Sequence, residues 1–271
     1  MPARLSNKPK SKRKGSGRVL PFANRQKQVK FKLYSRNIRK SIRVVHMKNK
    51  DIVHQLKKFP LLASLNKRDL EDMKQFIYWR TYHKGQILFM EDDPRERMYL
   101  LLDGFIKLEK SNEAGSMFYT DYVRPHTLFP FGGLFRDEHY HYAAEALTDI
   151  ELYYIPMNIF EDLVRDNKNL LYDILNHLSD ILALHEERLK RITLSHAHDR
   201  VTQAIYYLTE SLGQKESNST VINCPITAAE IAKISGTSRE TVSAVLKKLR
   251  CEGVISQMNK QIMINRPEYF M

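Results

Sequence analysis

The segment that most constrains the fold of this 271-residue chain spans residues 225–250 and reads PITAAEIAKISGTSRETVSAVLKKLR. Thr227 and Glu230 have the spacing of a capping box, which would open a first helix. Gly236 stands where a tight turn needs a left-handed residue, and Ser238 suits the N-cap of a second helix. Small or apolar residues occupy the positions at which the two helices would pack together: Ile231, Ala232, Val242 and Val245. Agreement at so many fixed offsets predicts a helix-turn-helix rather than an ordinary helical hairpin.

The second predicted helix would enter the major groove of DNA by its N-terminal turn. An arginine can bridge O6 and N7 of guanine, and a glutamate can accept from N4 of cytosine, so Arg239 and Glu240 are the candidates for reading bases. Hydroxyl groups and the helix N-terminus suit phosphate or base contacts. The complete set of predicted DNA-binding residues is Thr237, Ser238, Arg239, Glu240, Thr241, Ser243, Lys247 and Lys260.

A hairpin is predicted after Gly253, where residues 254–255 and 261–264 flank a turn at residues 259–260. It would form a wing with Lys260 at its tip, close to phosphate. Along the preceding helix, the basic residues Lys247, Lys248 and Arg250 either contact phosphate or form an ordinary solvated face.

Before this motif, the spacing of apolar residues indicates first helices and then strands. Helical spacing of apolar residues over 48–78, broken at Pro60, predicts two short helices. Residues 82–155 then carry short β-rich runs with turn residues between them, which is typical of an antiparallel barrel or sandwich. The predicted strands are Ile87–Met90, Met98–Leu102, Phe105–Leu108, Met117–Val123, Ala143–Leu147 and Glu151–Ile155, with turns at Gly85, Gly104 and Gly115. Residues 213–218 are predicted to form an exposed loop before a short strand at Val221–Cys224.

Residues 158–194 contain neither Pro nor Gly and predict one long uninterrupted helix, with Asn158 as its N-cap. One apolar stripe consists of Phe160, Val164, Leu171, Ile174, Leu178 and Ile181. A second stripe consists of Leu163, Leu170, Leu175, Leu182 and Leu189. A single small domain cannot cover both stripes, so a dimerisation helix is favoured over a helix packed only on its own domain.

The positive charge of the chain is concentrated at its N-terminus. Residues 1–46 contain 15 of the 44 Lys and Arg residues and no Asp or Glu, whereas residues 47–271 hold 29 basic and 31 acidic residues. The net positive charge of the chain therefore does not by itself indicate that the region after residue 46 binds nucleic acid. Three interpretations of the tail stay open: an arm attracted to polyanions, a disordered leader without a dedicated role, or an upstream translation with synthesis starting at Met47.

Composition excludes several classes of protein. Cys224 and Cys251 are too few for a disulfide scaffold or for the four thiolates of a typical iron–sulfur cluster. No apolar run approaches the roughly 18 residues of a membrane-spanning helix, and the N-terminus lacks the apolar core of a secretory signal. A soluble, cytoplasmic protein without membrane contact is therefore predicted.

Motifs of common enzyme and metal sites are missing as well. The chain has no Gly-x-Ser-x-Gly, Walker loop, His-Glu-x-x-His or Gly-x-Gly-x-x-Gly pattern, so we predict no enzymatic activity and no catalytic residue. Several potential ligands gather near the middle of the chain, but their spacing fits no standard metal site: His126, Asp137, Glu138, His139 and His141. No metal and no cofactor are predicted.

The run TSRETVSAVLKKL followed by GVI resembles the recognition helix and wing of the Crp/Fnr family of bacterial transcription regulators. Over residues 50–270 the order of segments is also similar, and it implies an α+β fold. The implied domains are a basic tail over 1–46, an antiparallel β-roll that resembles a cyclic-nucleotide sensor over 47–157, a dimerisation helix over 158–194 and a winged helix-turn-helix over 195–271. The resemblance implies a homodimer that binds an inverted-repeat operator in double-stranded DNA, with RNA polymerase as a further candidate partner.

The sequence departs from the family pattern at two places. Arg239 and Glu240 match the base-reading pair of the family, but Ala244 stands where a later Arg is usual, so the half-site preference is expected to differ. In the cyclic-nucleotide members a Gly-Glu and an Arg-Ser hold the ribose and the phosphate, whereas residues 132–133 are Gly-Gly and residues 141–142 are His-Tyr here. Without that Arg the phosphate loses its bidentate partner, so cyclic-nucleotide binding is not expected and the effector stays unknown.

Two other branches of the family give further expectations. Oxygen-sensing members use an N-terminal cysteine cluster, and residues 1–223 contain no cysteine, so an iron–sulfur sensor is not expected. The segments LFPFGGLF and YHYAAEALTDIELYYIP are similar to a Firmicutes branch that includes regulators of the arginine deiminase pathway. The alternative function is a ligand- or protein-binding β-roll module with a degenerate DNA-binding domain.

Overall fold

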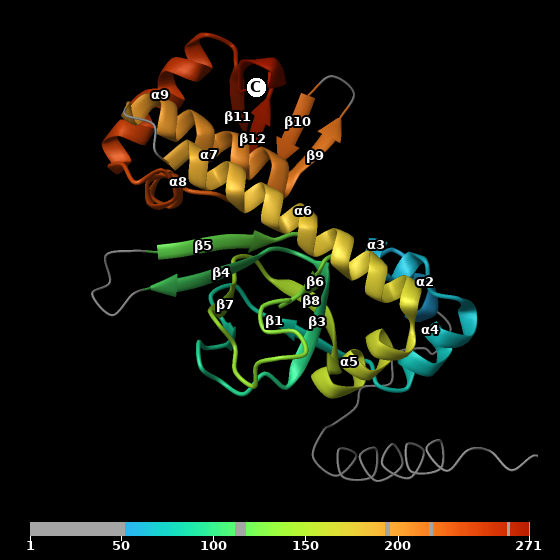
Figure 1. Ribbon diagram of the computed structural model, residues 1–271. Helices are drawn as coiled ribbons and strands as arrows, with labels where there is room; N and C mark the ends of the chain where they lie inside the picture. The colour runs from blue at the N-terminus through green and yellow to red at the C-terminus, as the bar shows by residue number, and fades with distance from the viewer. Residues whose placement is uncertain (1–51, 112–117, 193–195, 217–218, 259–260, 271) are drawn as a thin grey trace, which may run out of the picture. The chain divides into compact units, whose positions relative to one another are not determined.

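The computed structural model describes residues 52–111, 118–192, 196–216, 219–258 and 261–270 (Figure 1). The tail predicted over residues 1–46 and the turn at Gly115 lie outside these ranges. The described part begins with three short helices, α2 (Ile52–Leu56), α3 (Pro60–Ala63) and α4 (Lys67–Lys74), where the sequence predicted two. The third is separate because Asn66 caps it: its Oδ1 accepts from the backbone N–H of Asp69 at 3.0 Å.

Two four-stranded antiparallel sheets form the β-roll, in the orders β1-β8-β3-β6 and β2-β7-β4-β5. Their strands are β1 (Tyr78–Tyr82), β2 (Ile87–Phe89), β3 (Arg97–Asp103), β4 (Ile106–Ser111), β5 (Phe118–Val123), β6 (Leu128–Phe129), β7 (Ala143–Ala146) and β8 (Ile150–Pro156). The predicted antiparallel architecture is confirmed. Strands β1 and β6 were not predicted, because β1 is a half-buried edge strand without apolar alternation and β6 has only two residues.

The alternation of side chains along β3 divides the N-terminal core into two layers. Tyr99 and Leu101 face the space between the two sheets. Met98 and Leu100 point the other way and pack with apolar residues of the helices, among them Phe160. The sheet that contains β3 is thus covered on both faces, and the helices that follow the roll are anchored on it.

The prediction of one uninterrupted helix over 158–194 is wrong. The chain forms α5 (Met157–Asp166) and α6 (Lys168–Ile192), and between them Asn167 has extended backbone with φ −122° and ψ 104°. The Asn167 side chain explains the break, because its Oδ1 accepts from the N–H of Leu170 at 3.0 Å and its Nδ2 donates to Asp69 at 2.9 Å. Asn158 is not the N-cap: Pro156 occupies that position and makes no capping hydrogen bond.

The C-terminal elements form the helix-turn-helix and a third sheet, of strand order β11-β12-β10-β9. They are α7 (Ala197–Leu212), β9 (Gly213–Glu216), β10 (Ser219–Ile222), α8 (Ala228–Ser235), α9 (Arg239–Cys251), β11 (Ile255–Met258), β12 (Gln261–Ile264) and η1 (Pro267–Phe270). One apolar core joins the helices to the sheet and includes Val201, Ile231, Leu249 and Ile262.

The exposed loop predicted from Gly213 is instead strand β9 over its first four residues, paired with β10. Gly213 makes the sharp exit from α7 feasible, since a Cβ there would collide with the carbonyl oxygen of Thr209. Within the described ranges, no helix has the length and apolar content needed to cross a membrane.

Candidate DNA-binding site

The first helix of the motif, α8, begins and ends as its sequence predicts. Thr227 Oγ1 accepts from the N–H of Glu230 at 3.2 Å, and the Glu230 carboxylate accepts from the N–H of Thr227 at 2.7 Å, which completes a capping box. Gly236 ends the helix in the left-handed region, with φ 58° and ψ 40°. Its N–H donates to the carbonyl of Ala232, as is usual for a left-handed C-cap.

The second helix, α9, starts after Ser238, whose hydroxyl accepts from the N–H of Thr241 at 3.2 Å. The four residues predicted to pack the helices together are all buried: Ile231, Ala232, Val242 and Val245. The helix-turn-helix is therefore confirmed in its caps, its turn and its packing. The rigid turn fixes the direction of α9 and so fixes which residues its first turn presents to solvent.

Among the predicted DNA-binding residues, the exposed ones are Ser238, Arg239, Glu240, Ser243 and Lys247, with Thr237 and Thr241 half-buried. The half-buried hydroxyls are already engaged, because Thr237 Oγ1 lies 2.8 Å from Ser235 Oγ and Thr241 Oγ1 lies 3.2 Å from Ser238 Oγ. Lys260 lies outside the described residues, while the strands β11 and β12 that flank it form the predicted wing.

The carboxylate of Glu240 lies exposed at the tip of α9 and is ionised at neutral pH. Its own backbone N–H and the Ser238 hydroxyl hold the pKa of this carboxyl below its usual value, and the group is fully exposed. An ionised carboxylate can only accept, which suits the N4 amino group of cytosine. Next to it, the exposed guanidinium of Arg239 can only donate. The tip of α9 therefore presents one donor group and one acceptor group side by side.

A residue whose role the sequence left open, Arg250, lies at the edge of this surface. Its Nη1 donates to Gln257 Oε1 of β11 at 2.8 Å. Helical spacing could have indicated that Arg250 belongs to this surface. Ser243 follows Arg239 by four residues and Arg250 follows Ser243 by seven, so the three side chains share one edge of α9. No local pattern pairs Arg250 with Gln257, because Gln257 belongs to strand β11 rather than to α9.

Aromatic rings stack on one another in the core between the two sheets of the β-roll. Phe89 stacks on Tyr140 and on Tyr99, with ring centroids 3.8 and 5.7 Å apart, and Tyr99 stacks on Phe129 at 5.3 Å. Near the family's Arg-Ser position, His141 Nε2 lies 2.9 Å from an Asp137 carboxylate oxygen. No group of three or more His, Cys, Asp or Glu suited to a metal ion occurs in the described part of the chain.

The β-sheet domain, the helices after it and the C-terminal helix-turn-helix define the class: an α+β protein that links a sensor-like roll to a DNA-binding domain. Residues 79–167 match the model of the cyclic nucleotide-binding domain, and residues 199–270 match the Crp-like helix-turn-helix domain. The HTH-type transcriptional regulator ArcR of Staphylococcus epidermidis is 30% identical over 193 residues, which cover 71% of this chain and 84% of the relative. The chain belongs to the Crp/Fnr family of transcription regulators.

Solved structures agree with this assignment. A transcriptional regulator of the CRP/FNR family from Thermus thermophilus is 30% identical, with a TM-score of 0.52, and the match covers 71% of this chain and 95% of that one. FixK2 from Bradyrhizobium japonicum has a TM-score of 0.62 at 18% identity, covering 72% of this chain and 95% of its own, which supports the fold alone. The chain is thus a Crp-like transcription regulator with a helix-turn-helix DNA-binding domain.

Proposed function

We propose that the protein binds an inverted-repeat operator as a homodimer, with the first turn of α9 reading bases in the major groove. The single observation that carries the proposal is the exposure of Arg239 and Glu240 at the start of a helix whose direction the turn at Gly236 fixes. A guanidinium and a carboxylate in that place can read a guanine and a cytosine edge. The protein then acts by binding rather than by catalysis, in the cytoplasm, with RNA polymerase as a further partner.

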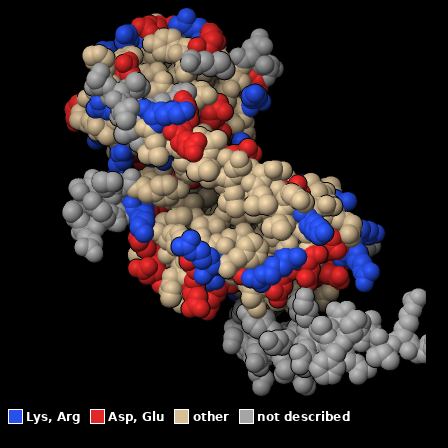
Figure 2. Space-filling model, viewed as in Figure 1, with Lys and Arg blue, Asp and Glu red and all other residues tan. Residues whose placement is uncertain are grey.

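An apolar stripe on α6 supports the homodimer. Tyr172, Leu175, Leu182 and Leu189 are 65%, 52%, 60% and 66% exposed, and the leucines are seven residues apart. That spacing keeps the side chains on one face, as in a coiled-coil seam. Figure 2 shows a mostly uncharged band along the course of α6, with Lys, Arg, Asp and Glu beside it. Leu170, which the sequence placed in this stripe, is buried in the protein's own core.

The dimer can be tested at the middle of this stripe. Leu182→Asp places a charge at the predicted seam, where burying it unpaired would cost several kcal/mol. We expect this variant to become monomeric in analytical ultracentrifugation and to lose operator affinity. Asn176→Asp is the matched control, because Asn176 is exposed on α6 outside the stripe. A wild-type protein that stays monomeric at ~100 µM would contradict the homodimer, since obligate dimers are formed well below that concentration.

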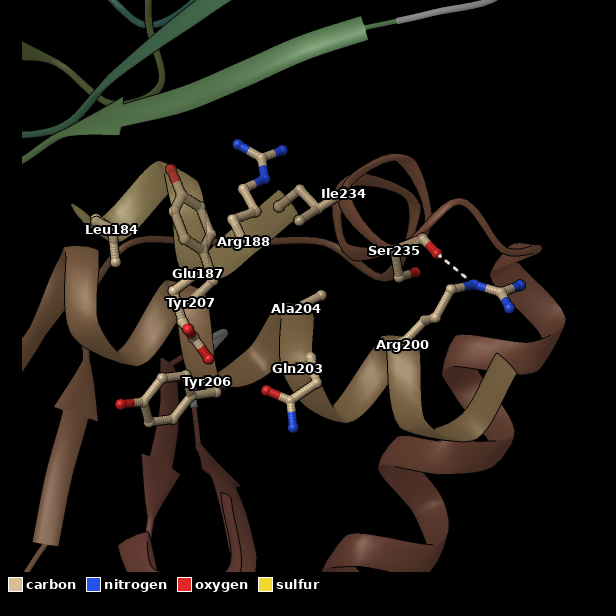
Figure 3. A pocket seen from close by; sticks show the side chains of 10 residues that line it. All are labelled: Leu184, Glu187, Arg188, Arg200, Gln203, Ala204, Tyr206, Tyr207, Ile234 and Ser235. Carbon is tan, nitrogen blue, oxygen red and sulfur yellow. Dashed lines mark hydrogen bonds between the residues drawn. The ribbon is translucent and has the colours of Figure 1, made fainter. Parts of the chain in front are cut away.

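Hydrogen bonds from α6 and α7 to strand β5 of the β-roll give a physical route for regulation. Tyr207 of α7 donates to Asp121 of β5 at 2.6 Å, and Arg188 of α6 donates to the carbonyl of Thr120 at 2.8 Å. Figure 3 shows both side chains directed toward β5, beside a cavity of about 30 Å³ between α6, α7 and α8. We infer that a change in the roll shifts the population of α7 and α8 orientations through these contacts.

The effector is proposed not to be a cyclic nucleotide. Stacked rings occupy the interior of the roll, and the position of the phosphate-binding Arg holds a His that pairs with Asp137. A ligand would have to displace aromatic side chains that are buried, such as Tyr99 and Phe129.

The base-reading role is tested with Arg239→Ala in a titration against the operator and an unrelated duplex. We expect the preference for the operator to fall by ~10-fold or more, while salt-sensitive binding to both duplexes persists. Arg68→Ala serves as the control, because Arg68 is an exposed arginine on α4. Unchanged preference in Arg239→Ala would remove Arg239 from the proposed interface.

A further inference from the structure

A groove runs along the edge of α9 between the start of α8 and the wing strand β11. Its volume is about 300 Å³, and its lining includes Ile226, Ser243, Leu246, Arg250, Gln257 and Ile262. Apolar side chains make most of this lining, and among the described residues that line the groove Arg250 alone is charged. Such a groove accepts an elongated group that is apolar on one side and anionic on the other.

The guanidinium of Arg250 is held in place but not neutralised. Arg250 is exposed, and its Nη1 donates to the Gln257 side chain at 2.8 Å. Among the described residues, no carboxylate lies within ion-pair distance of it. Because only Nη1 donates to Gln257, the other N–H groups of the guanidinium can bind a further acceptor. The amide of Gln257 is neutral, so it orients the guanidinium without cancelling its charge.

The position of Arg250 continues the surface proposed to read DNA. Ser243 lines the groove and lies on the same edge of α9 as Arg239, and Arg250 follows seven residues further along that edge. The start of α8 contributes no net positive charge, because the Glu230 carboxylate already caps it. The positive charge beside the groove therefore belongs to Arg250.

We propose that one sugar–phosphate strand of the operator lies along this groove, with Arg250 bonding a phosphate and Gln257 positioning its guanidinium. The inference rests on the proposed function and extends the DNA footprint from the tip of α9 to the base of the wing. An arginine fork matches two phosphate oxygens, and an amide that restricts its rotation lowers the entropy lost on binding. A phosphate contact strengthens binding to all sequences, whereas Arg239 sets the preference among them.

The experiment measures dissociation constants by fluorescence anisotropy for an operator duplex and an unrelated duplex over a series of NaCl concentrations. The variants are Arg250→Gln, Arg250→Lys and Gln257→Ala, with Arg68→Gln as a control for the loss of one exposed positive charge. In Arg250→Gln we expect both affinities to fall by the same factor, about five- to tenfold, and the slope of log K against log salt to decrease by about 0.9. Arg250→Lys and Gln257→Ala keep the charge and hence the slope, with affinity lowered about two- to threefold.

The outcomes separate this inference from the proposed function. If Arg250→Gln leaves affinity and slope at wild-type values while Arg239→Ala removes operator preference, the groove does not hold a strand and base reading by α9 stands. If Arg250→Gln changes operator preference without changing the slope, Arg250 contacts a base and the phosphate assignment is overturned. If no variant, Arg239→Ala included, alters binding, the proposed function itself fails. Circular dichroism and thermal unfolding verify that each variant is folded.

Discussion

The hydrogen bond from Tyr207 to Asp121 joins α7 of the C-terminal domain to β5 of the β-roll, and its contribution to stability can be calculated. The hydroxyl of Tyr207 is buried and lies 2.6 Å from Asp121 Oδ1. A hydrogen bond to a charged group contributes roughly 1.5–3 kcal/mol. In Tyr207→Phe the carboxylate keeps its bond from the N–H of Tyr122 at 2.7 Å, so the lower end of this range applies and we expect a loss of about 1.5 kcal/mol.

The reverse substitution is expected to cost more. Asp121→Ala leaves the Tyr207 hydroxyl buried without its acceptor, so the free energy of unfolding should fall by about 3 kcal/mol. At about 2–4 °C per kcal/mol for a chain of this size, the two variants should melt roughly 3–6 °C and 6–12 °C below the wild type. Both changes are measured by thermal and urea unfolding followed by circular dichroism.

A double-mutant cycle isolates the pair itself. Combining Tyr207→Phe with Asp121→Ala should give an interaction energy of about 1–2 kcal/mol, because the hydrogen bond that the two residues share is lost in either single variant and can be lost only once. Tyr269→Phe is the control that removes a hydroxyl near the C-terminus, at a residue 39% exposed, and should stay within about 0.5 kcal/mol. Strict additivity in the cycle would refute the claim that this hydrogen bond holds α7 on the β-roll.

Two further predictions follow from the turn and from α6. Gly236→Ala should lower the free energy of unfolding by about 1 kcal/mol through backbone strain alone, since φ is 58° and nothing lies within 4 Å of the added Cβ; an unchanged urea midpoint would contradict this. Burial lowers the pKa of His177, with the Asp180 charge acting against it. The unfolded chain therefore takes up a proton at this imidazole first as the pH falls below about 6.5, and native stability declines. His177→Gln should flatten that decline in urea unfolding at about pH 7.5 and pH 5.5, and an unaltered pH profile would exclude the residue as its source.

Short-range patterns allowed most of the motif to be predicted. The capping box, the left-handed turn and the N-cap of α9 each involve residues no more than four positions apart, so their chemistry is written in the local sequence. Two apolar stripes over residues 158–194 predicted more apolar surface than one domain can cover, and Leu175, Leu182 and Leu189 of the second stripe are exposed. The family resemblance added the order of the domains.

The predictions of secondary structure that were wrong share one cause. The break at Asn167 needs Asp69, nearly a hundred residues earlier, and β9 exists because β10 pairs with it. A propensity for helix or loop cannot anticipate a partner that the fold brings in from elsewhere. For the same reason, the sequence could not show that Leu170 belongs to the protein's own core rather than to the exposed stripe on α6.

The sequence by itself determined the helix-turn-helix, the residue types exposed at the tip of α9 and an apolar stripe on α6, because these depend on spacing within one or two helical turns. Only the tertiary structure decided that aromatic rings fill the roll, that Tyr207 meets Asp121 and that Arg250 is oriented by Gln257. Each of these contacts joins elements that are separate in the chain, and their energies depend on distances that exist only after the elements have packed together.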